Sequence, residues 1–373
     1  MVKTKTLNIL VINWQDITNP LGGGAEVHCH EIFKRVAALG HRVTLLCCRY
    51  PGAVAQEVID DITIIRCGSR TDFNFHVPAV YRRLAKKQRF DIVVDDINKI
   101  PFYTPLYVKE PVLAILHHLF GKSIYLETSW IPASYVYTSE KVVPVIYKNT
   151  PFAVVSESTR QELLRLGIRS HISLVQNAVD LQKYHCDPAG KKGEPLLGYL
   201  GRVKKYKCVD HILRAMPEII KSVPNVRLLV IGGGDHIPNL EKLAVTLGVR
   251  ERITFTGHVS HEQKLTLLNS LTVCVNPSPK EGWGLTVIEA NACGVPVVAA
   301  DSPGLRDSVM HEKTGLLYPF GNIKKLVQYS IELLTDQKKQ SILSKNSVNW
   351  VQRFSWEESA LKVIDVIYSI IRN

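Results

Sequence analysis

The sequence predicts an α/β protein with two domains, each built on a doubly wound parallel sheet. Short apolar strands at 43–48 and 62–66 alternate with helical stretches, which is typical of a parallel sheet covered by helices. Residues 272–300 give the clearest such unit: a strand, a proline-broken loop, a helix closed by Gly294 and a second strand. A chain of 373 residues, of which 46% are hydrophobic, has enough apolar side chains for two medium-sized cores.

Composition indicates the cellular compartment in which the protein works. No apolar run approaches the length of a bilayer span, and the residues before the first strand are too few for a secretory signal. The eight cysteines form no C-x-x-C pair, and several lie in apolar segments, so we expect buried thiols rather than disulfides or zinc ligands. These features favour a cytoplasmic protein.

The formal net charge of +12 indicates an anionic partner: nucleic acid, an anionic membrane surface or a phosphate-rich substrate. Residues 81–90, YRRLAKKQRF, contain five bases and no acid. They form either a solvated helix face or a contact for lipid headgroups, with Val80, Leu84 and Phe90 dipping into the membrane. The charge is spread over both halves of the chain without a basic groove motif, which argues against nucleic acid.

The loop inside the 272–300 unit has the features of an anion site. Gly282 and Gly284 carry no side chain, so a ligand can approach the backbone N–H groups of Leu285 and Thr286 closely. The N-terminus of a helix at the carboxyl edge of a parallel sheet attracts anions, phosphates above all. The loop therefore predicts a phosphate-binding site.

Two carboxylates, Glu281 and Glu289, flank this point. Because carboxylates repel phosphate, we expect them to bind hydroxyl groups beside it; a solvated loop acid and a capping acid are the alternative. The two acids around Gly-Trp-Gly, followed by Glu-Ala-Asn-Ala-Cys-Gly-Val-Pro-Val-Val, resemble the donor-site signature of retaining nucleotide-sugar glycosyltransferases with the GT-B fold. The similarity runs from Leu7 to the last helix. It points to the large family-four, or group 1, type of mannosyl-, glucosyl- and N-acetylglucosaminyltransferases.

This resemblance implies two Rossmann-like domains that face each other across a cleft. Residues 1–187 would form the acceptor-side domain and residues 188–354 the nucleotide-sugar domain, with a linker at 187–195. Residues 355–373 would form a helix that returns to pack on the first domain.

A glycine-rich turn follows the first strand, residues 7–13. The sequence Leu-Gly-Gly-Gly-Ala-Glu ends at Glu26, and a helix runs from there to Leu39. In the resembled family the matching loop meets the donor diphosphate, which implies roles for Gly23, Gly24 and Glu26. The residues alone fit a flexible loop equally well, since the spacing is not that of a dinucleotide site.

Two pairs of polar residues follow strands in the first half. Asp95 and Asp96 are expected just after a strand, and we interpret them as structural because the D-x-D spacing of metal-dependent glycosyltransferases is absent. His117 and His118 follow the strand 112–116. A histidine at this strand end reaches the donor sugar in the resembled family. His117 is the first candidate and His118 the second, because one residue of register decides which points inward.

The rest of the first half is less informative. The aromatic segment 124–148 is expected to line the acceptor side of the cleft, with an ordinary packed loop-and-helix region as the alternative. Strands at 152–156 and 172–175 flank a helix. Residues 177–180, Asn-Ala-Val-Asp, resemble the Asn-Gly-Val-Asp between the family's domains, with alanine in place of glycine.

The second domain opens with a strand and then Gly-Arg-Val-Lys-Lys-Tyr-Lys. This resembles a family signature in which an arginine and a lysine clamp the diphosphate, and it implies that role for Arg202 and Lys207. Cys208 stands where glycine is usual, and Lys204 and Lys205 leave open which lysine points inward. Fixed cations here would stabilise the charge on the leaving group without a metal.

The remaining elements complete the second sheet. Strands are expected at 226–231 and 253–256, the first followed by Gly-Gly-Gly-Asp and the second by Val259. In the resembled family the backbone at the position of Val259 contacts the nucleobase edge. We assign no catalytic role to 301–307, and Ser355 is expected to cap the last helix.

Taken together, the resemblance implies a retaining, metal-independent hexosyltransferase of polysaccharide biosynthesis that needs no cofactor. It would move a hexose from a UDP- or GDP-linked donor to a hydroxyl of a glycan or lipid-linked acceptor, in the cytoplasm or peripherally at the inner face of the membrane. Glu289 would bind the ribose hydroxyls and Glu281 those of the sugar. A nucleotide-sugar 2-epimerase on the same architecture is the alternative. The identities of the donor base, the sugar and the acceptor are not encoded in recognisable side chains.

Overall fold

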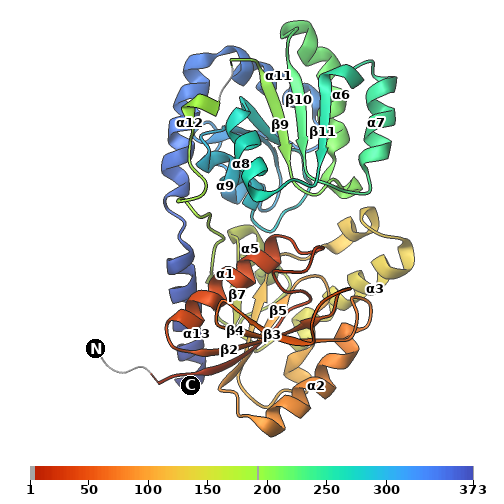
Figure 1. Cartoon of the computed structure of the whole chain (residues 1–373). Helices are drawn as coiled ribbons and strands as arrows, with labels where there is room; N and C mark the ends of the chain where they lie inside the picture. The colour runs from red at the N-terminus through yellow and green to blue at the C-terminus, as the bar shows by residue number, and fades with distance from the viewer. Residues whose placement is uncertain (1–4, 191–192, 373) are drawn as a thin grey trace. The chain divides into compact units, whose positions relative to one another are not determined.

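The computed structural model describes residues 5–190 and 193–372, and these residues form two compact units (Figure 1). The chain passes from the first unit to the second between Asn177 and Ala178, and it returns to the first at Trp356. Residues 123–129 also belong to the second unit. The expected linker at 187–195 therefore lies within the second unit, and its Lys191 and Lys192 lie outside the described residues.

The first unit is built on an eight-stranded sheet in the order β3-β4-β2-β1-β5-β6-β7-β8. Neighbouring strands are parallel except at β3, which pairs antiparallel with β4. The strands are β1 (Asn8–Ile12), β2 (Arg42–Cys48), β3 (Gln56–Ile59), β4 (Ile62–Cys67), β5 (Ile92–Ile97), β6 (Val112–Leu116), β7 (Phe152–Val154) and β8 (Ile172–Leu174). The helices are α1 (Gly24–Ala38), α2 (Phe73–Lys87), α3 (Trp130–Lys141), α4 (Val143–Ile146), α5 (Glu157–Arg165), α13 (Trp356–Arg372) and the 3-10 turn η1 (Thr104–Leu106).

The second unit is built on a six-stranded parallel sheet in the order β11-β10-β9-β12-β13-β14. The strands are β9 (Leu196–Leu200), β10 (Arg227–Ile231), β11 (Ile253–Gly257), β12 (Val273–Asn276), β13 (Val297–Asp301) and β14 (Gly315–Pro319). The helices are α6 (Val209–Ser222), α7 (Ile237–Thr246), α8 (His261–Ser270), α9 (Leu285–Ala292), α10 (Leu305–Ser308), α11 (Ile323–Thr335) and α12 (Gln337–Val351). Short 3-10 turns are η3 (Pro188–Gly190), η4 (Lys205–Lys207) and η5 (Arg250–Arg252), and η2 (Gly121–Leu126) spans the passage between units.

The last helix, α13, belongs to the first unit. It packs beside α1, and Arg35 of α1 donates a hydrogen bond from Nε to Glu357 at 2.8 Å. The Ser359 hydroxyl donates to the carbonyl of Gln176 at 2.8 Å. The buried side chains of α13 recur on one face of the helix, which is why the chain ends by covering this unit.

The predicted end of one strand in the first unit is wrong. Strand β5 continues to Ile97, so Asp95 and Asp96 lie inside the strand and are fully buried. Asp95 accepts hydrogen bonds from the Tyr147 hydroxyl at 2.5 Å and from Thr104 Oγ1 at 2.7 Å. Burial raises its pKa to about 6. In the sequence, paired carboxylates at a strand end suggest a loop. Their burial is possible because residues from outside the strand donate hydrogen bonds to them.

The apolar residues of the basic segment 81–90 and its neighbour Val80 are not a membrane-dipping face. Val80 and Phe90 are 9% and 1% exposed, so both belong to the core of the first unit, and Leu84 is half-buried. The five bases, in contrast, are exposed. No helix in the described part of the chain is both long and apolar enough to cross a membrane.

Candidate functional site

The candidate residues of the second unit follow parallel strands of one sheet. Arg202 comes after β9, Val259 after β11 and the loop 277–284 after β12. Because the carboxyl ends of parallel strands meet at one edge of a sheet, the loops that carry these residues meet there too. Val259 is half-buried and immediately precedes Ser260, the N-cap residue of α8, which leaves its backbone near the surface.

Helix α9 begins at Leu285, directly after the glycine-containing loop. Its N-cap, Gly284, has a φ of +90°, in the left-handed region. Leu285 and Thr286 are half-buried at the start of the helix, where backbone N–H groups have no intrahelical acceptor. Gly282 is also half-buried. The helix start is therefore accessible, and its partial positive charge suits an anion.

Lys207 and Glu281 form an ion pair beside this helix, with Nζ and Oε1 2.5 Å apart. Their side chains are 13% and 17% exposed. Burial lowers the pKa of Lys207, because it disfavours the charged form. The negative charge of Glu281 has the larger opposite effect, so the pKa of Lys207 is raised. Lys204 pairs instead with Asp235 at 2.6 Å, and Lys205 is exposed. Of the three lysines, Lys207 is therefore the one held against the candidate acid.

The loop that carries Arg202 packs on the glycine turn 232–234, which follows β10. The N–H of Val203 donates to the carbonyl of Gly233 at 2.8 Å, and a Cβ on Gly234 would lie 2.0 Å from the carbonyl oxygen of Val203. Only glycine permits this approach. The Tyr199 hydroxyl donates to the carbonyl of Arg202 at 3.0 Å. The Arg202 side chain is exposed on this fixed backbone.

Glu289 lies on the first turns of α9 and is 8% exposed. Its Oε1 accepts hydrogen bonds from the Tyr184 hydroxyl at 2.6 Å and from Lys264 Nζ at 2.9 Å. Among the described residues both contacts fall on Oε1, which leaves Oε2 for a ligand. Sequence reasoning missed Tyr184 and Lys264, because neither belongs to a recognisable motif.

The segment after β13 supports Glu281, although no motif in this segment predicts such a contact. The N–H of Glu281 donates to the carbonyl of Pro303 at 3.0 Å. Gly304 has a φ of +83°, and a Cβ there would lie 2.2 Å from the carbonyl oxygen of Glu281. The segment has a positioning role for the acid rather than a chemical one.

In the first unit, the predicted glycine loop is shorter than expected. Helix α1 begins at Gly24, and Glu26 lies in its first turn. Glu26 Oε2 accepts a hydrogen bond from the N–H of Gly23 at 2.6 Å, and its Oε1 accepts one from Asn98 at 2.8 Å. Glu26 is therefore buried and braces the turn, while Gly23 is half-buried and Gly24 exposed.

His117 follows β6 and is the histidine that points inward. Its Nε2 lies 2.8 Å from Asp96 Oδ1, and its side chain is 7% exposed. The ring of His28 lies 5.0 Å away in an edge-on arrangement. Burial and the charge of His117 hold the pKa of His28 well below its usual range. His118 packs on Phe120 instead, with ring centroids 4.5 Å apart.

The candidates thus form two sets, each within its own unit. Gly23, Gly24 and His117 lie in the first unit, whereas Arg202, Lys207, Val259, Glu281, Gly282, Gly284, Leu285, Thr286 and Glu289 lie in the second. Two α/β units of this topology define the GT-B class of proteins. Two family models match consecutive parts of the chain: Glycosyltransferase Family 4 over residues 22–183 and Glycosyl transferases group 1 over residues 182–350. The chain belongs to this family of glycosyltransferases.

Comparison with individual proteins agrees with this assignment. A GDP-mannose-dependent alpha-(1-6)-phosphatidylinositol monomannoside mannosyltransferase of Mycobacterium tuberculosis is 29% identical over 231 residues, which cover 57% of this chain and 60% of that protein. An uncharacterized glycosyltransferase of Methanocaldococcus jannaschii is 24% identical over 96% of this chain and 97% of its own. Among solved structures, sucrose-phosphate synthase from Thermosynechococcus elongatus is similar in fold, with a TM-score of 0.84, 22% identity and coverage of 98% and 99% of the two chains. None of these three proteins is named as an epimerase.

Proposed function

We propose that the protein transfers a hexosyl group from a nucleoside-diphosphate sugar to a hydroxyl group of a glycan or lipid-linked acceptor. The observation that carries this proposal is the Lys207–Glu281 pair, held beside the N-terminus of α9. A cation and a helix N-terminus suit a diphosphate, and a half-buried acid beside them suits sugar hydroxyls. Arg202 supplies a second cation at the same edge of the sheet.

The proposed transfer proceeds with retention of configuration. The bond between the sugar's anomeric carbon and the phosphate oxygen breaks, and its electron pair leaves with the diphosphate. The acceptor oxygen forms a bond to the same face of the anomeric carbon, and its proton passes to the departing phosphate oxygen. Arg202 and Lys207 stabilise the charge that develops on the leaving group. Glu281 binds the sugar hydroxyls, and Glu289 binds the ribose.

A donor screen tests the proposal without knowledge of the acceptor. Saturation-transfer NMR with GDP-mannose, UDP-glucose and UDP-N-acetylglucosamine is expected to detect binding of at least one of them. GDP-mannose is tested first because the mycobacterial relative is named as dependent on it. Conversion of a bound donor to its 2-epimer without an acceptor would instead support an isomerase, and absence of binding by all three would contradict the proposal.

Transfer activity is expected to survive treatment with EDTA. In the proposed site Arg202 and Lys207 neutralise the diphosphate, so no divalent cation is needed at the leaving group. The measurement is turnover after chelation, with added magnesium or manganese as the comparison. Loss of turnover on chelation that is restored by either ion would contradict metal independence.

We further propose that the enzyme works peripherally at the inner face of a membrane, held by charge. The five exposed bases of segment 81–90 lie in the second half of α2 and just after its end. They present a positive surface without an acid between them. Phe75 on the same helix is 70% exposed and Trp130 on α3 is 72% exposed, and Asn74 of α2 donates to the Tyr135 hydroxyl of α3 at 2.9 Å. Exposed aromatic side chains suit the headgroup region.

Vesicle flotation tests this attachment. Anionic vesicles are expected to recover more protein than neutral ones, and added salt is expected to release it, because the attraction is screened within about 8 Å at physiological ionic strength. The test variant replaces by glutamine the five exposed bases Arg82, Arg83, Lys86, Lys87 and Arg89. The control variant replaces five exposed bases of the second unit, Lys221, Arg227, Lys324, Lys338 and Lys345. Equal recovery of both variants, or equal recovery on both kinds of vesicle, would contradict the proposal and leave the transfer reaction untouched.

A further inference from the structure

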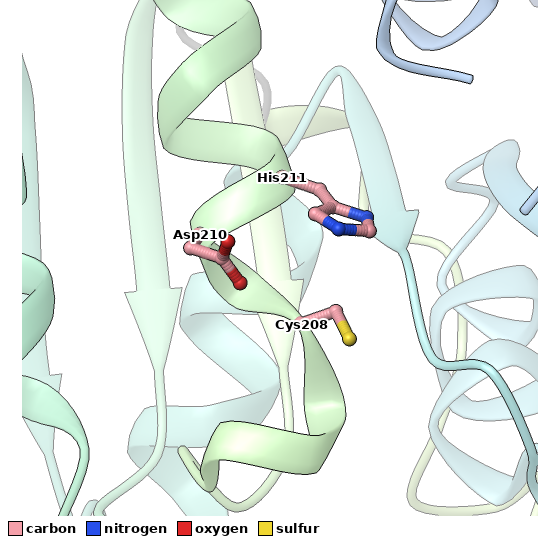
Figure 2. Close-up of side chains that lie close together, drawn as sticks. All are labelled: Cys208, Asp210 and His211. Atoms are coloured by element: carbon pink, nitrogen blue, oxygen red, sulfur yellow. The ribbon is translucent and has the colours of Figure 1, made fainter. Parts of the chain in front are cut away.

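Cys208, Asp210 and His211 bring three metal-binding atoms together at the start of α6 (Figure 2). The cysteine sulfur, a carboxylate oxygen and an imidazole nitrogen all lie within 4.8 Å of one another. All three residues are half-buried. Sulfur, nitrogen and oxygen ligands in one cluster are the donor set that zinc uses in proteins.

The local backbone explains why these side chains meet. Cys208 is the N-cap residue of α6 and has a φ of +53°, a left-handed conformation that is uncommon for a residue with a side chain. Asp210 and His211 then lie in the first helical turn. Figure 2 shows the three side chains projecting around this single turn. The sequence favours buried thiols, but Cys208 is only partly covered, so a ligand can reach it.

A second element supplies independent support. The carboxyl end of β14 lies over this turn, since the ring of Phe320 is 5.5 Å from that of His211. The neighbouring Tyr318 is fully buried, and its hydroxyl has no hydrogen-bond partner within residues 5–190 and 193–372. His211 Nδ1 is likewise buried without a partner there. Buried polar atoms without partners are costly unless a ligand satisfies them.

We propose that Cys208, Asp210 and His211 bind a zinc ion at the start of α6. Zinc bonds of about 2.0–2.3 Å in a tetrahedral arrangement place ligand atoms roughly 3.3–3.8 Å apart, so from separations of up to 4.8 Å the three atoms need to close by at most about 1.5 Å. The thiol releases its proton to solvent on binding. Asp210 accepts a long hydrogen bond of 3.4 Å from Arg214 on one oxygen, and the other oxygen remains for the metal. Three protein ligands leave one coordination position for solvent.

The position of the site gives it a bracing role rather than a chemical one. Cys208 directly follows Lys207, so a metal bound here fixes the turn from which that lysine reaches Glu281. The zinc site goes beyond the proposed transfer reaction and does not depend on it. Chelation of this zinc would loosen that turn without removing an ion from the leaving group, so a loss of turnover that zinc restores, and magnesium or manganese do not, would come from this site.

Titration of the reduced, full-length protein with Co²⁺ tests the site without an activity assay. Cobalt bound to a thiolate gives a charge-transfer band in the near-ultraviolet, and zinc should displace it. The background variant Cys186→Ser removes an exposed cysteine and is expected to keep the band. The Cys208→Ser variant is expected to lose it, and His211→Gln is expected to weaken binding by at least about tenfold.

Thermal unfolding provides the second measurement. Zinc is expected to raise the Tm of the wild type and of Cys186→Ser, because it binds the folded form, and to leave that of Cys208→Ser unchanged. If Cys208→Ser does not fold, Asp210→Asn and His211→Gln carry the comparison. A charge-transfer band absent from the wild type, or retained in both Cys208→Ser and His211→Gln, would overturn the proposal.

Discussion

The Lys207→Ala variant is expected to turn over at least about 10²-fold more slowly than the wild type. Removing one preorganised positive group from a developing negative charge has an effect of that size. The substitution also leaves the half-buried carboxylate of Glu281 without its ion-pair partner. The measurement is kcat with saturating donor and acceptor.

Lys205→Ala is the matched control for this variant. Lys205 lies two residues away in the same 3-10 turn, and it is exposed. Its loss should change kcat little. Because breaking a buried ion pair destabilises a protein by about 3–5 kcal/mol, circular dichroism must establish that Lys207→Ala is folded at the assay temperature. A folded Lys207→Ala protein with wild-type kcat would remove this lysine from the leaving-group site.

The Glu289→Ala variant is expected to bind the nucleotide sugar more weakly by about 1.5–3 kcal/mol, the contribution of a hydrogen bond to a charged group. The donor's ribose hydroxyls lose their acceptor, and Lys264 and the Tyr184 hydroxyl lose theirs. Isothermal titration calorimetry with the donor measures the change.

Glu262→Ala provides the control for this second variant, since Glu262 is an exposed glutamate on α8, two residues before Lys264. Tyr184→Phe should produce a smaller loss than Glu289→Ala, because it removes support for the carboxylate and keeps the carboxylate itself. Donor affinity equal to that of the wild type in Glu289→Ala would exclude this residue from the ribose site.

Much of the fold could be predicted because its strands are short, apolar and separated by clear turn signals. Strand β6 has the bounds that its pattern predicts, and β2 and β4 differ from prediction by one residue at one end. The edge strand β3 could not be predicted, because Gln-Glu-Val-Ile is largely exposed and carries little apolar alternation. Antiparallel pairing with β4, rather than its own pattern, makes it a strand.

In the candidate site, sequence motifs identify single residues, whereas only the fold reveals the contacts between them. Lys207 and Glu281 could be singled out because they stand in motifs, and their pairing at 2.5 Å is a tertiary fact. Tyr184 lies 105 positions from Glu289 in the sequence, so only the fold reveals their contact. Asp96 was interpreted as structural, yet the fold makes it the partner of His117. The burial of Phe90 was missed for a related reason, since an apolar residue among bases has no periodicity that fixes its side.

The chain crosses from the first unit to the second between Asn177 and Ala178, and this position determines where chimeras with related proteins can be joined. Tyr184 lies beyond the crossing and holds Glu289, so a chimera joined at the expected linker, residue 187, would take this tyrosine from the wrong parent. A chimera joined at 177 keeps the acid and its support together. The last segment, from Trp356 onward, must come from the parent of the first half, because α13 completes that unit. Grafting of donor specificity therefore requires two junctions rather than one.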